Sequence, residues 1–324
     1  MFDVITIGAA TRDVFLVSKD FQIINSPRFV GGQAECVALG SKLDVEKLVF
    51  STGGGATNAA VTFARLGFQT AIVARIGNDD PGAAIVEDLS LDNVHTELLR
   101  VSTKEQTAYS TLLTAKNGER SALVYRGTSN SFSTTDIPWK KLTSKWLYIT
   151  TLGGNLELLQ KILTQAKRQG IKVALNPGRA ELKRAVEMRE LLSAMSVLIV
   201  NLEEAQQLAE SEDKDPVKLA KRLSYPELTV IVTNGSQGAY AYANGQAWYT
   251  RTTNVKAVSR TGAGDAFGSG TVAGLAKGLT LDAALRVGTL NAESVIQKFG
   301  AKAGILTTWP KPRQLARVGV KLVK

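Results

Sequence analysis

The sequence contains few of the residues that cross-link proteins or bind metals. Its 324 residues include one cysteine, Cys36, and one histidine, His95. A single thiol cannot form an intrachain disulfide, and one thiol with one imidazole cannot supply the ligands of a thiolate and imidazole zinc site. No stretch approaches the roughly 20 apolar residues that a membrane helix requires, and the opening FDVITIGAA predicts a strand rather than a signal peptide. These absences favour a cytoplasmic enzyme without zinc and without a membrane partner.

Acidic residues are outnumbered by basic ones, with 29 Asp and Glu against 39 Lys and Arg and a net charge of +10. Nucleic-acid binding requires this charge to be clustered, and here it is scattered. The densest basic groups, at 161–168 and 311–324, have no interleaved aromatic residues and are typical of a solvated helix face and tail. We therefore expect no nucleic-acid partner, and a positive field that attracts small anionic substrates such as nucleotides.

Two common nucleotide-binding motifs are absent. The chain has no G-x-x-x-x-G-K-[ST] loop, and its first apolar run continues into GAATRD rather than G-x-G-x-x-G. P-loop and dinucleotide-binding folds depend on those glycines to bring the backbone close to phosphates. A P-loop enzyme and a nicotinamide dehydrogenase are therefore disfavoured.

What the chain does have is a regular alternation of apolar strand-like runs and amphipathic helical runs. This alternation predicts an α/β fold with a parallel sheet covered on both faces. Two helices have clear ends, one starting after three glycines and ending at Gly67, the other ending at Gly170. The expected strands are residues 4–8, 71–76, 146–150, 172–175, 197–200 and 228–233.

Two stretches, 14–51 and 103–130, interrupt the alternation with strand-like sequence. The second contains Asn117-Gly118, a strong hairpin signal. We expect a small accessory sheet that acts as a lid over substrate, as an oligomerisation surface, or as both. A further hairpin is expected around Asn244-Gly245, on the edge of the main sheet. The predicted division is a core of residues 1–13, 52–102 and 131–324, with the lid in 14–51 and 103–130.

Two polar groups lie near the N-terminus. The run STGGGATNAA places Gly53 and Gly54 ahead of a helix, where backbone amides are exposed to a ligand, and adds the amide of Asn58. Asp13 follows the first strand, where ligands bind in open α/β sheets, and is suited to accept hydrogen bonds from hydroxyl groups. Tight packing of the glycines and a solvated loop acid are the alternatives that local sequence leaves open.

A third group, SRTGAGDAFGSG at 259–270, places an acid among glycines at an expected helix start. The amides of 262–265 would converge at the positive end of the helix dipole and form an anion hole. Asp265 would then be placed to take a proton from an attacking hydroxyl during phosphoryl transfer. The local alternative is an Asp that only caps the helix.

Together these motifs resemble the ribokinase-like (PfkB) carbohydrate kinase family over nearly the whole chain. The resemblance rests on GGGATNAAVTFARLG, on VNLEEA at 200–205, on TNGSQGAYAY at 233–242, on RTGAGDAFGSG at 260–270 and on NAESVIQKFGAKAG at 291–304. It implies a three-layer α/β/α ribokinase-like sandwich with a small β-sheet lid, an ATP-dependent kinase that uses Mg²⁺, and a homodimer formed through the lid.

The resemblance also implies roles for individual residues. Asp265 matches the catalytic base, and Gly262, Ala263 and Gly264 match the anion hole. Asn201 and Glu204 match the element that organises Mg²⁺ and the ATP phosphates through water, with no direct protein ligand to the metal. Thr233, Gly235 and Gly238 match the loop along the nucleotide, and Asn291 matches a residue beside the adenine. Asp13, Gly53, Gly54 and Asn58 match the contacts to substrate hydroxyls.

The chain departs from the family pattern D-T-T-G-A-G-D, in which the first acid helps to hold a monovalent cation. Here Ser259, Arg260 and Thr261 precede the glycines. A need for potassium is therefore in doubt, and one hypothesis is that the charge of Arg260 replaces that of the cation.

The acceptor is the least determined feature. A neutral sugar is the first expectation and a nucleoside the second. Arg126, at the return of the lid hairpin, leaves open a third candidate, a sugar acid or sugar phosphate. Arg75 and Arg179 are further candidates for the site, with exposed loop arginines as the alternative. A ligand-binding regulator without turnover is the rival from another class, and the presence of Asp265 with its glycines favours an enzyme.

Overall fold

The computed structural model describes residues 1–29, 32–115, 120–253 and 255–323. Within these residues a nine-stranded sheet forms the core, in the order β17-β16-β15-β14-β13-β12-β11-β1-β6. The six strands from β14 to β6 in this order are parallel, and the other three are antiparallel. The bounds are β1 Phe2–Ile7, β6 Thr70–Val73, β11 Ser144–Ile149, β12 Lys172–Leu175, β13 Val197–Asn201, β14 Thr229–Thr233, β15 Ala239–Ala243, β16 Gln246–Thr250 and β17 Val320–Val323.

The predicted parallel strands are confirmed, with one change. The expected strand at 71–76 is divided: β6 ends at Val73, and β7 (Arg75–Gly77) pairs with β8 (Arg100–Ser102) in a separate two-stranded sheet. The hairpin at Asn244-Gly245 is confirmed, with φ of 50° and 78° at its two turn residues. It does not form the edge of the sheet, because β17 pairs outside β16. The basic tail expected to be solvated thus provides an edge strand.

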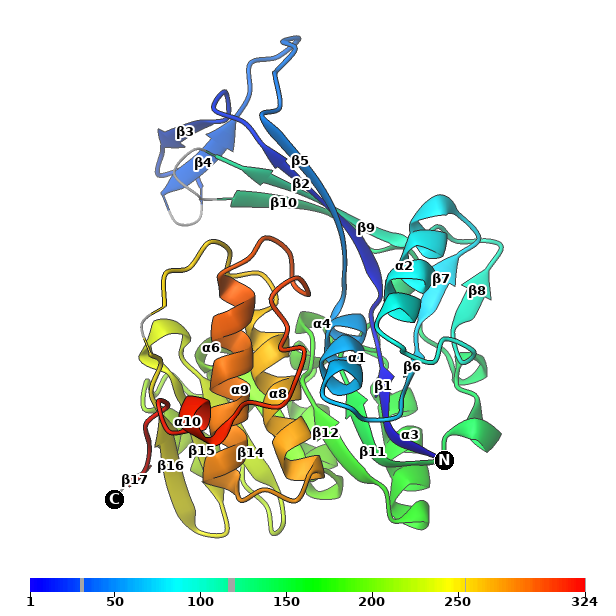
Figure 1. The fold of residues 1–324 in the computed structure, drawn as a ribbon, viewed down its shortest axis with the longest axis vertical. Coiled ribbons are helices and arrows are strands. Elements are labelled where there is room, and N and C mark those ends of the chain that lie inside the picture. The colour runs from blue at the N-terminus through cyan, green and yellow to red at the C-terminus, as the bar shows by residue number, and fades with distance from the viewer. Residues whose placement is uncertain (30–31, 116–119, 254, 324) are drawn as a thin grey trace.

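Helices cover both faces of this sheet and produce the three layers (Figure 1). Val4 and its register partner Trp146 pack under α1 and α8, whereas Ile5 and its partner Leu147 pack under α3 on the opposite face. Because side chains alternate along a strand, both faces of each strand are apolar, as a doubly covered sheet requires. The helices are α1 Gly55–Arg65, α2 Asp80–Leu91, α3 Leu156–Gln169, α4 Arg179–Leu182, α5 Ala185–Leu191, α6 Leu202–Ala209, α7 Pro216–Arg222, α8 Ala263–Ala276, α9 Leu281–Ile296 and α10 Pro312–Leu315.

A second, four-stranded sheet projects from one end of the core, at the top of Figure 1. It has the order β10-β9-β2-β5, with β2 Thr11–Val17, β5 Lys47–Gly53, β9 Ala108–Thr114 and β10 Arg120–Tyr125. The short strands β3 Gln22–Asn25 and β4 Gln33–Cys36 pair at its far end. The expected turn at Asn117-Gly118 lies outside the described residues. Since β2 begins at Thr11 and β5 ends at Gly53, Asp13 is part of the lid sheet and not of the core.

The strand register gives the lid two different faces. Asp13, Phe15, Ser51 and Ser110 share the face toward the core, where Phe15 stacks edge to face on Phe299. Beyond its base, where Val14 and Thr52 are buried, the opposite face is apolar and open to solvent. Its members Leu48, Phe50, Leu123 and Tyr125 are each more than half exposed.

Membrane insertion has no support among the helices described. None of them is both long enough and apolar enough to cross a bilayer.

Candidate active site

The start of α8 has the geometry of an anion-binding turn. Gly262 is the N-cap residue, with a left-handed φ of 79°, and the helix begins at Ala263. The first amides of a helix have no partner within the helix, and they carry the positive end of its dipole. No side chain caps this end. Asp265 is therefore not the helix cap that local sequence allowed, and its carboxylate is available for another role.

The carboxylate of Asp265 is held from a distant part of the chain. Asn58 Nδ2, on α1, donates to Asp265 Oδ2 at 2.8 Å across 207 residues of sequence. Loss of hydration on burial raises the pKa of Asp265, and the Asn58 hydrogen bond opposes this rise. The other amide atom, Asn58 Oδ1, is buried with no hydrogen-bond partner among the described residues. An acceptor atom without a partner next to a carboxylate indicates a place for a donor from a ligand.

Asp13 lies beside this pair, 7% exposed, on the inner face of the lid sheet. Burial raises its pKa to about 6, whereas a hydrogen bond from Ser110 and the charges of Lys302 and Arg12 lower it. The neighbouring glycines are required by close contacts. A Cβ atom at Gly53 would lie 2.0 Å from Asp13 Oδ2, and one at Gly54, whose φ is 95°, would lie 2.4 Å from the carbonyl oxygen of Ala9. The expected substrate residues are thus brought together.

A groove of about 860 Å³ runs from the anion-binding turn along the carboxyl ends of β13 and β14. Asn201 and Thr233 are register partners at these two ends, where ligands bind in open α/β sheets. Of the residues predicted for the nucleotide or the anion hole, Asn201, Thr233, Gly235, Gly238, Ala263 and Gly264 line the groove.

Sequence reasoning missed one wall of this groove. One side of α9 contributes Thr289, Ala292, Glu293 and Ile296. These positions recur at helical spacing and face the groove together, so the periodic pattern could have found them. Val255 and Ala257 add to the wall from the loop between β16 and α8, which gave no recognisable signal.

Asn201 and Glu204 form a reciprocal cap at the start of α6. Asn201 Oδ1 accepts from the Glu204 amide, and Glu204 Oε2 accepts from the Asn201 amide, both at 2.9 Å. Burial raises the pKa of Glu204, and the Asn201 amide lowers it. The described residues contain no group of three His, Cys, Asp or Glu side chains able to hold a metal. A single nearby carboxylate fits a Mg²⁺ ion that keeps its waters and is held mainly by substrate phosphates.

Asn291 requires a correction, because it lies outside the groove. Its side chain is fully buried, donates from Nδ2 to the carbonyl oxygen of Ala266 at 2.8 Å and accepts from the Leu306 amide at 3.0 Å. The asparagine therefore joins α8, α9 and the following loop, and its neighbours Ala292 and Glu293 face the groove instead.

The residues preceding the anion-binding turn contact the lid. Ser259 is buried, and its Oγ accepts from Arg120 Nη1 of β10 and from the Thr261 amide, at 3.2 and 3.3 Å. Arg260 lines the groove. Arg126 is exposed, and its side chain forms no hydrogen bond or ion pair with the described residues.

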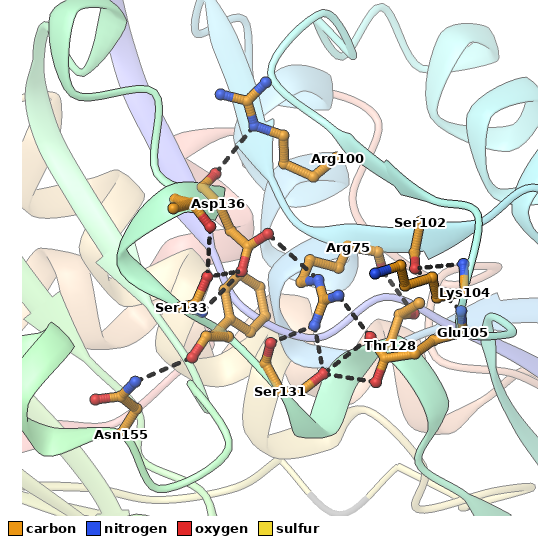
Figure 2. Close-up of polar contacts among 12 residues, drawn as sticks. Arg75, Arg100, Ser102, Lys104, Glu105, Thr128, Ser131, Ser133, Asp136 and Asn155 are labelled. Atoms are coloured by element: carbon orange, nitrogen blue, oxygen red, sulfur yellow. Dashed lines mark hydrogen bonds and ion pairs between the residues drawn. The ribbon is translucent and has the colours of Figure 1, made fainter.

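Arg75 lies at the root of the lid and not in the pocket (Figure 2). Its guanidinium pairs with Glu105 at 2.5 Å and with Asp136 at 3.4 Å, and it also donates to the backbone and side chain of Ser131. Glu105 and Ser131 stand where the chain enters and leaves the second lid insertion. The guanidinium group of Arg75 thus joins both ends of the second lid insertion to β7.

Comparison with known proteins agrees with this geometry. The model of the pfkB family carbohydrate kinases matches residues 3–308. The chain is 27% identical to a ribokinase of Haemophilus influenzae over 83% of this chain and 88% of the relative. It is 28% identical to a cytidine kinase of Thermococcus kodakarensis over 76% of this chain and 88% of the relative.

Solved structures show the same fold. A ribokinase from Cryptococcus neoformans var. grubii serotype A in complex with ADP superposes with a TM-score of 0.74 and 22% identity, over 98% of this chain and 99% of that one. The family match over nearly the full length adds the reaction class. The chain therefore belongs to the pfkB family of carbohydrate kinases and is a phosphotransferase with a hydroxyl group as acceptor.

Proposed function

We propose that the protein transfers the γ-phosphoryl group of ATP to a hydroxyl group of a small sugar, with Asp265 as the base. The observation that carries this proposal is the position of the Asp265 carboxylate. It lies in the first turn of α8, is held by Asn58 of the acceptor pocket, and adjoins the groove that Ala263 and Gly264 line. Acid, anion-binding amides and both substrate sites thus meet at one helix end.

The reaction follows from these positions. Asp265 takes the proton of the acceptor hydroxyl as its oxygen bonds to the γ-phosphorus, and the bond from phosphorus to the bridging oxygen of ADP breaks. The amides of Gly262, Ala263 and Gly264, with the dipole of α8 behind them, stabilise the charge on the transferring group. Mg²⁺, when bound, neutralises phosphate charge. Asn201 and Glu204 would orient the water around that ion.

The two substrates occupy different sides of Asp265. Asp13 and the backbone of Gly53 and Gly54 contact acceptor hydroxyls, and the free Asn58 Oδ1 accepts from one of them. The nucleotide lies along Thr233, Gly235 and Gly238, against the wall that α9 contributes. Asn291 supports this wall from behind without touching the nucleotide.

A nucleoside is the second candidate acceptor, because one relative is named a cytidine kinase and one structural neighbour, at 22% identity, an adenosine kinase. A sugar acid or sugar phosphate is the third, and rests on Arg126, whose exposed guanidinium has no partner among the described residues. The pocket around Asp13 is anionic, and this favours a neutral polyol over an anion.

A panel of acceptors tests the proposal. ADP release is measured with D-ribose, D-fructose, cytidine, adenosine and D-gluconate, for the wild type and for Asp265→Asn. We expect turnover with at least one neutral acceptor and a loss of kcat of about 10²- to 10⁴-fold in the variant. Equal rates from the two proteins would rule out Asp265 as the base, and activity with gluconate alone would move the assignment to the third candidate.

We also propose that two copies associate through the lid. The outer face formed by Leu48, Phe50, Leu123 and Tyr125 is apolar and exposed, and such patches mark association surfaces. Light scattering should give twice the chain mass for the wild type and the chain mass for Leu48→Glu with Leu123→Glu. A wild-type monomer at micromolar concentration would refute this association.

A further inference from the structure

The segment after α9 contacts the lid. Phe299 stacks against Phe15 of β2, with ring centroids 6.5 Å apart. A Cβ atom at Gly300 would lie 3.0 Å from the hydroxyl of Ser51, on β5. The segment therefore touches β2, the lid strand that carries Asp13, and its neighbour β5.

The next residue of the segment contacts the anion-binding turn. A Cβ atom at Gly262 would lie 2.5 Å from Cβ of Ala301, so the two backbones are in close contact. Any shift of the segment would displace either the lid base or this turn, because packed backbones cannot move independently.

Lys302 completes the segment and is buried, with 5% of its surface exposed. Its Nζ donates to Asp88 Oδ2 of α2 at 2.9 Å and to the hydroxyl of Thr52 on β5. Thr52 in turn donates to Asp88. Burial lowers the pKa of Lys302, and the charge of Asp88 opposes this effect. One ammonium group thus joins the segment, the lid base and α2.

The main chain at this point is fixed as well. Arg65, paired with Asp92 at 2.6 Å, donates from Nη1 to the carbonyl oxygen of Lys302 at 3.0 Å. The charged groups that act on the ammonium are therefore Asp88, Asp13 and Asp92, with Arg65 at its own carbonyl.

The contact with Thr52 is one residue from the acceptor pocket. Gly53 follows Thr52 and packs directly on the Asp13 carboxylate. The charge of Lys302 also acts on that carboxylate, and with Arg12 and the Ser110 hydroxyl it favours the ionised form, whereas burial and Asp265 favour the protonated form. The ammonium group of Lys302 therefore influences both the position and the charge of the Asp13 carboxylate.

Stability gives little reason for a lysine here. The Asp88 side chain is 39% exposed, so solvent screens its pairing with Lys302, and burial of the ammonium group itself costs free energy. A buried ammonium between Thr52 and Asp88 is better explained by what it does to the neighbouring pocket.

We propose that Lys302 is a positioning residue of the acceptor site: it clamps the Thr52 end of β5 onto α2 and so holds Gly53 and the Asp13 carboxylate in the arrangement that binds an acceptor hydroxyl. The inference rests on the proposed function for the identity of that site. Lys302 itself lies outside the pocket, and its loss is expected to weaken acceptor binding without weakening ATP binding.

Kinetics of Lys302→Met test the clamp with the acceptor that the panel identifies. The matched control is Lys298→Met, which removes the same charge from an exposed position in the same segment. We expect the acceptor KM of Lys302→Met to rise about fivefold at pH 7, the loss of roughly one hydrogen bond. Its KM for ATP should stay within about twofold of the wild type, since the clamp lies outside the nucleotide groove.

The pH profile separates the clamp from a merely structural role. Loss of the positive charge raises the pKa of Asp13, so its carboxylate becomes protonated at a higher pH. As the pH is lowered, acceptor affinity should therefore begin to fall at a higher pH in Lys302→Met than in the wild type. Lys298→Met should follow the wild-type profile. An unchanged acceptor KM and pH profile in folded Lys302→Met would overturn the proposal.

A second measurement needs no turnover. Thermal midpoints at pH 8 are compared for the wild type, Lys302→Met, Asp13→Asn and the double variant. We expect Lys302→Met to lower the midpoint more in the wild-type background than in the Asp13→Asn background. Equal decreases in both backgrounds would contradict the coupling, even if the kinase is active. Coupling without activity on any acceptor would instead reject the proposed function and keep the clamp.

If Lys302→Met does not fold, Thr52→Val removes only the hydroxyl that receives the ammonium. This variant should again raise the acceptor KM and leave the KM for ATP unchanged, and the opposite pattern would refute the clamp.

Discussion

The groove that we propose for the nucleotide and the pocket that we propose for the acceptor meet at Asp265 but are built in different ways. The groove is open, lined by backbone-rich turns and by one side of α9, and its key polar pair is a local cap four residues long. The acceptor pocket instead depends on buried charged groups brought from remote parts of the chain: Asn58 to Asp265 over 207 residues and Lys302 to Thr52 over 250. The proposed nucleotide site can thus be built largely from local turns, whereas the proposed acceptor site depends on residues that only tertiary folding brings together.

The largest loss of activity is expected from a change at the anion-binding turn, where the two regions meet. Gly262→Ala places a methyl group against Ala301 and strains a left-handed turn, so the anion-binding amides lose their alignment. We expect kcat to fall about 10²- to 10³-fold. Gly278→Ala is the control, because Gly278 has a φ of 85° with no atom within 4 Å of its added Cβ.

Both glycine variants should lose stability from backbone strain, and Gly262→Ala should lose more because its methyl group also meets Ala301. Only Gly262→Ala should lose activity. Similar kcat losses in the two would show that strain alone is responsible and that the turn has no special role.

The next effect concerns the acceptor side. Asp13→Asn removes the charged hydrogen-bond acceptor, and the acceptor KM should rise roughly 10- to 100-fold. The same change should stabilise the fold at pH 8. The pKa of Asp13 is raised to about 6 by burial, so its ionised form destabilises the native state above that pH.

The gain in unfolding free energy is expected to be at most about 3 kcal/mol, from a pKa shift of about two units. It should disappear as the pH falls below about 4, where Asp13 is protonated in both states. Chemical denaturation at pH 4 and pH 8 measures it. A stability difference that is larger at pH 4 would contradict the proposed origin of the shift.

A smaller effect is expected on the nucleotide side, where the KM for ATP should change and the acceptor KM should not. Gly238 has a φ of 91°, and an added Cβ would lie 2.1 Å from the carbonyl oxygen of Thr250. Gly238→Ala should raise the KM for ATP by about tenfold, equivalent to about 1.4 kcal/mol, and leave the acceptor KM unchanged. Gly245→Ala, also left-handed but in open space at a hairpin turn, should change neither. A larger change in the acceptor KM would mean that the two sites are not separable.

The smallest effect is expected from the choice of monovalent cation. Arg260 lines the groove next to the anion-binding turn, and a serine stands at the first position of the motif. Activity in potassium and sodium salts of equal ionic strength should agree within about twofold. A clear preference for potassium would reject the hypothesis that Arg260 replaces the cation.

The difference between the two regions also explains how far sequence reasoning reached. The parallel strands, the helix ends at Gly67 and Gly170, and the Asn201–Glu204 element are local patterns with local causes, and the structure has them where they were expected. The Asp265 alternatives could not be separated locally, because its side chain forms a hydrogen bond with Asn58, 207 residues away along the chain, and does not cap its own helix.

The errors have the same origin. Asn291 was placed beside the nucleotide from its position in a motif, but its orientation is set by partners on α8 and after α9. The role of β17 as the edge strand was missed, because a basic tail gives no signal of the strand that it will meet. Lys302 gave no sequence signal at all, since burial and partners exist only after folding.

The guanidinium of Arg75 gives the lid a fixed attachment point. It joins both ends of the second insertion to β7 (Figure 2), and it adds to the attachment that β9 has through its pairing with β2. For protein engineering, an exchange of the chain between Glu105 and Ser131 would keep the Arg75 contacts only if both of these residues were retained. The inserted segment would also have to supply a strand that pairs with β2 as β9 does.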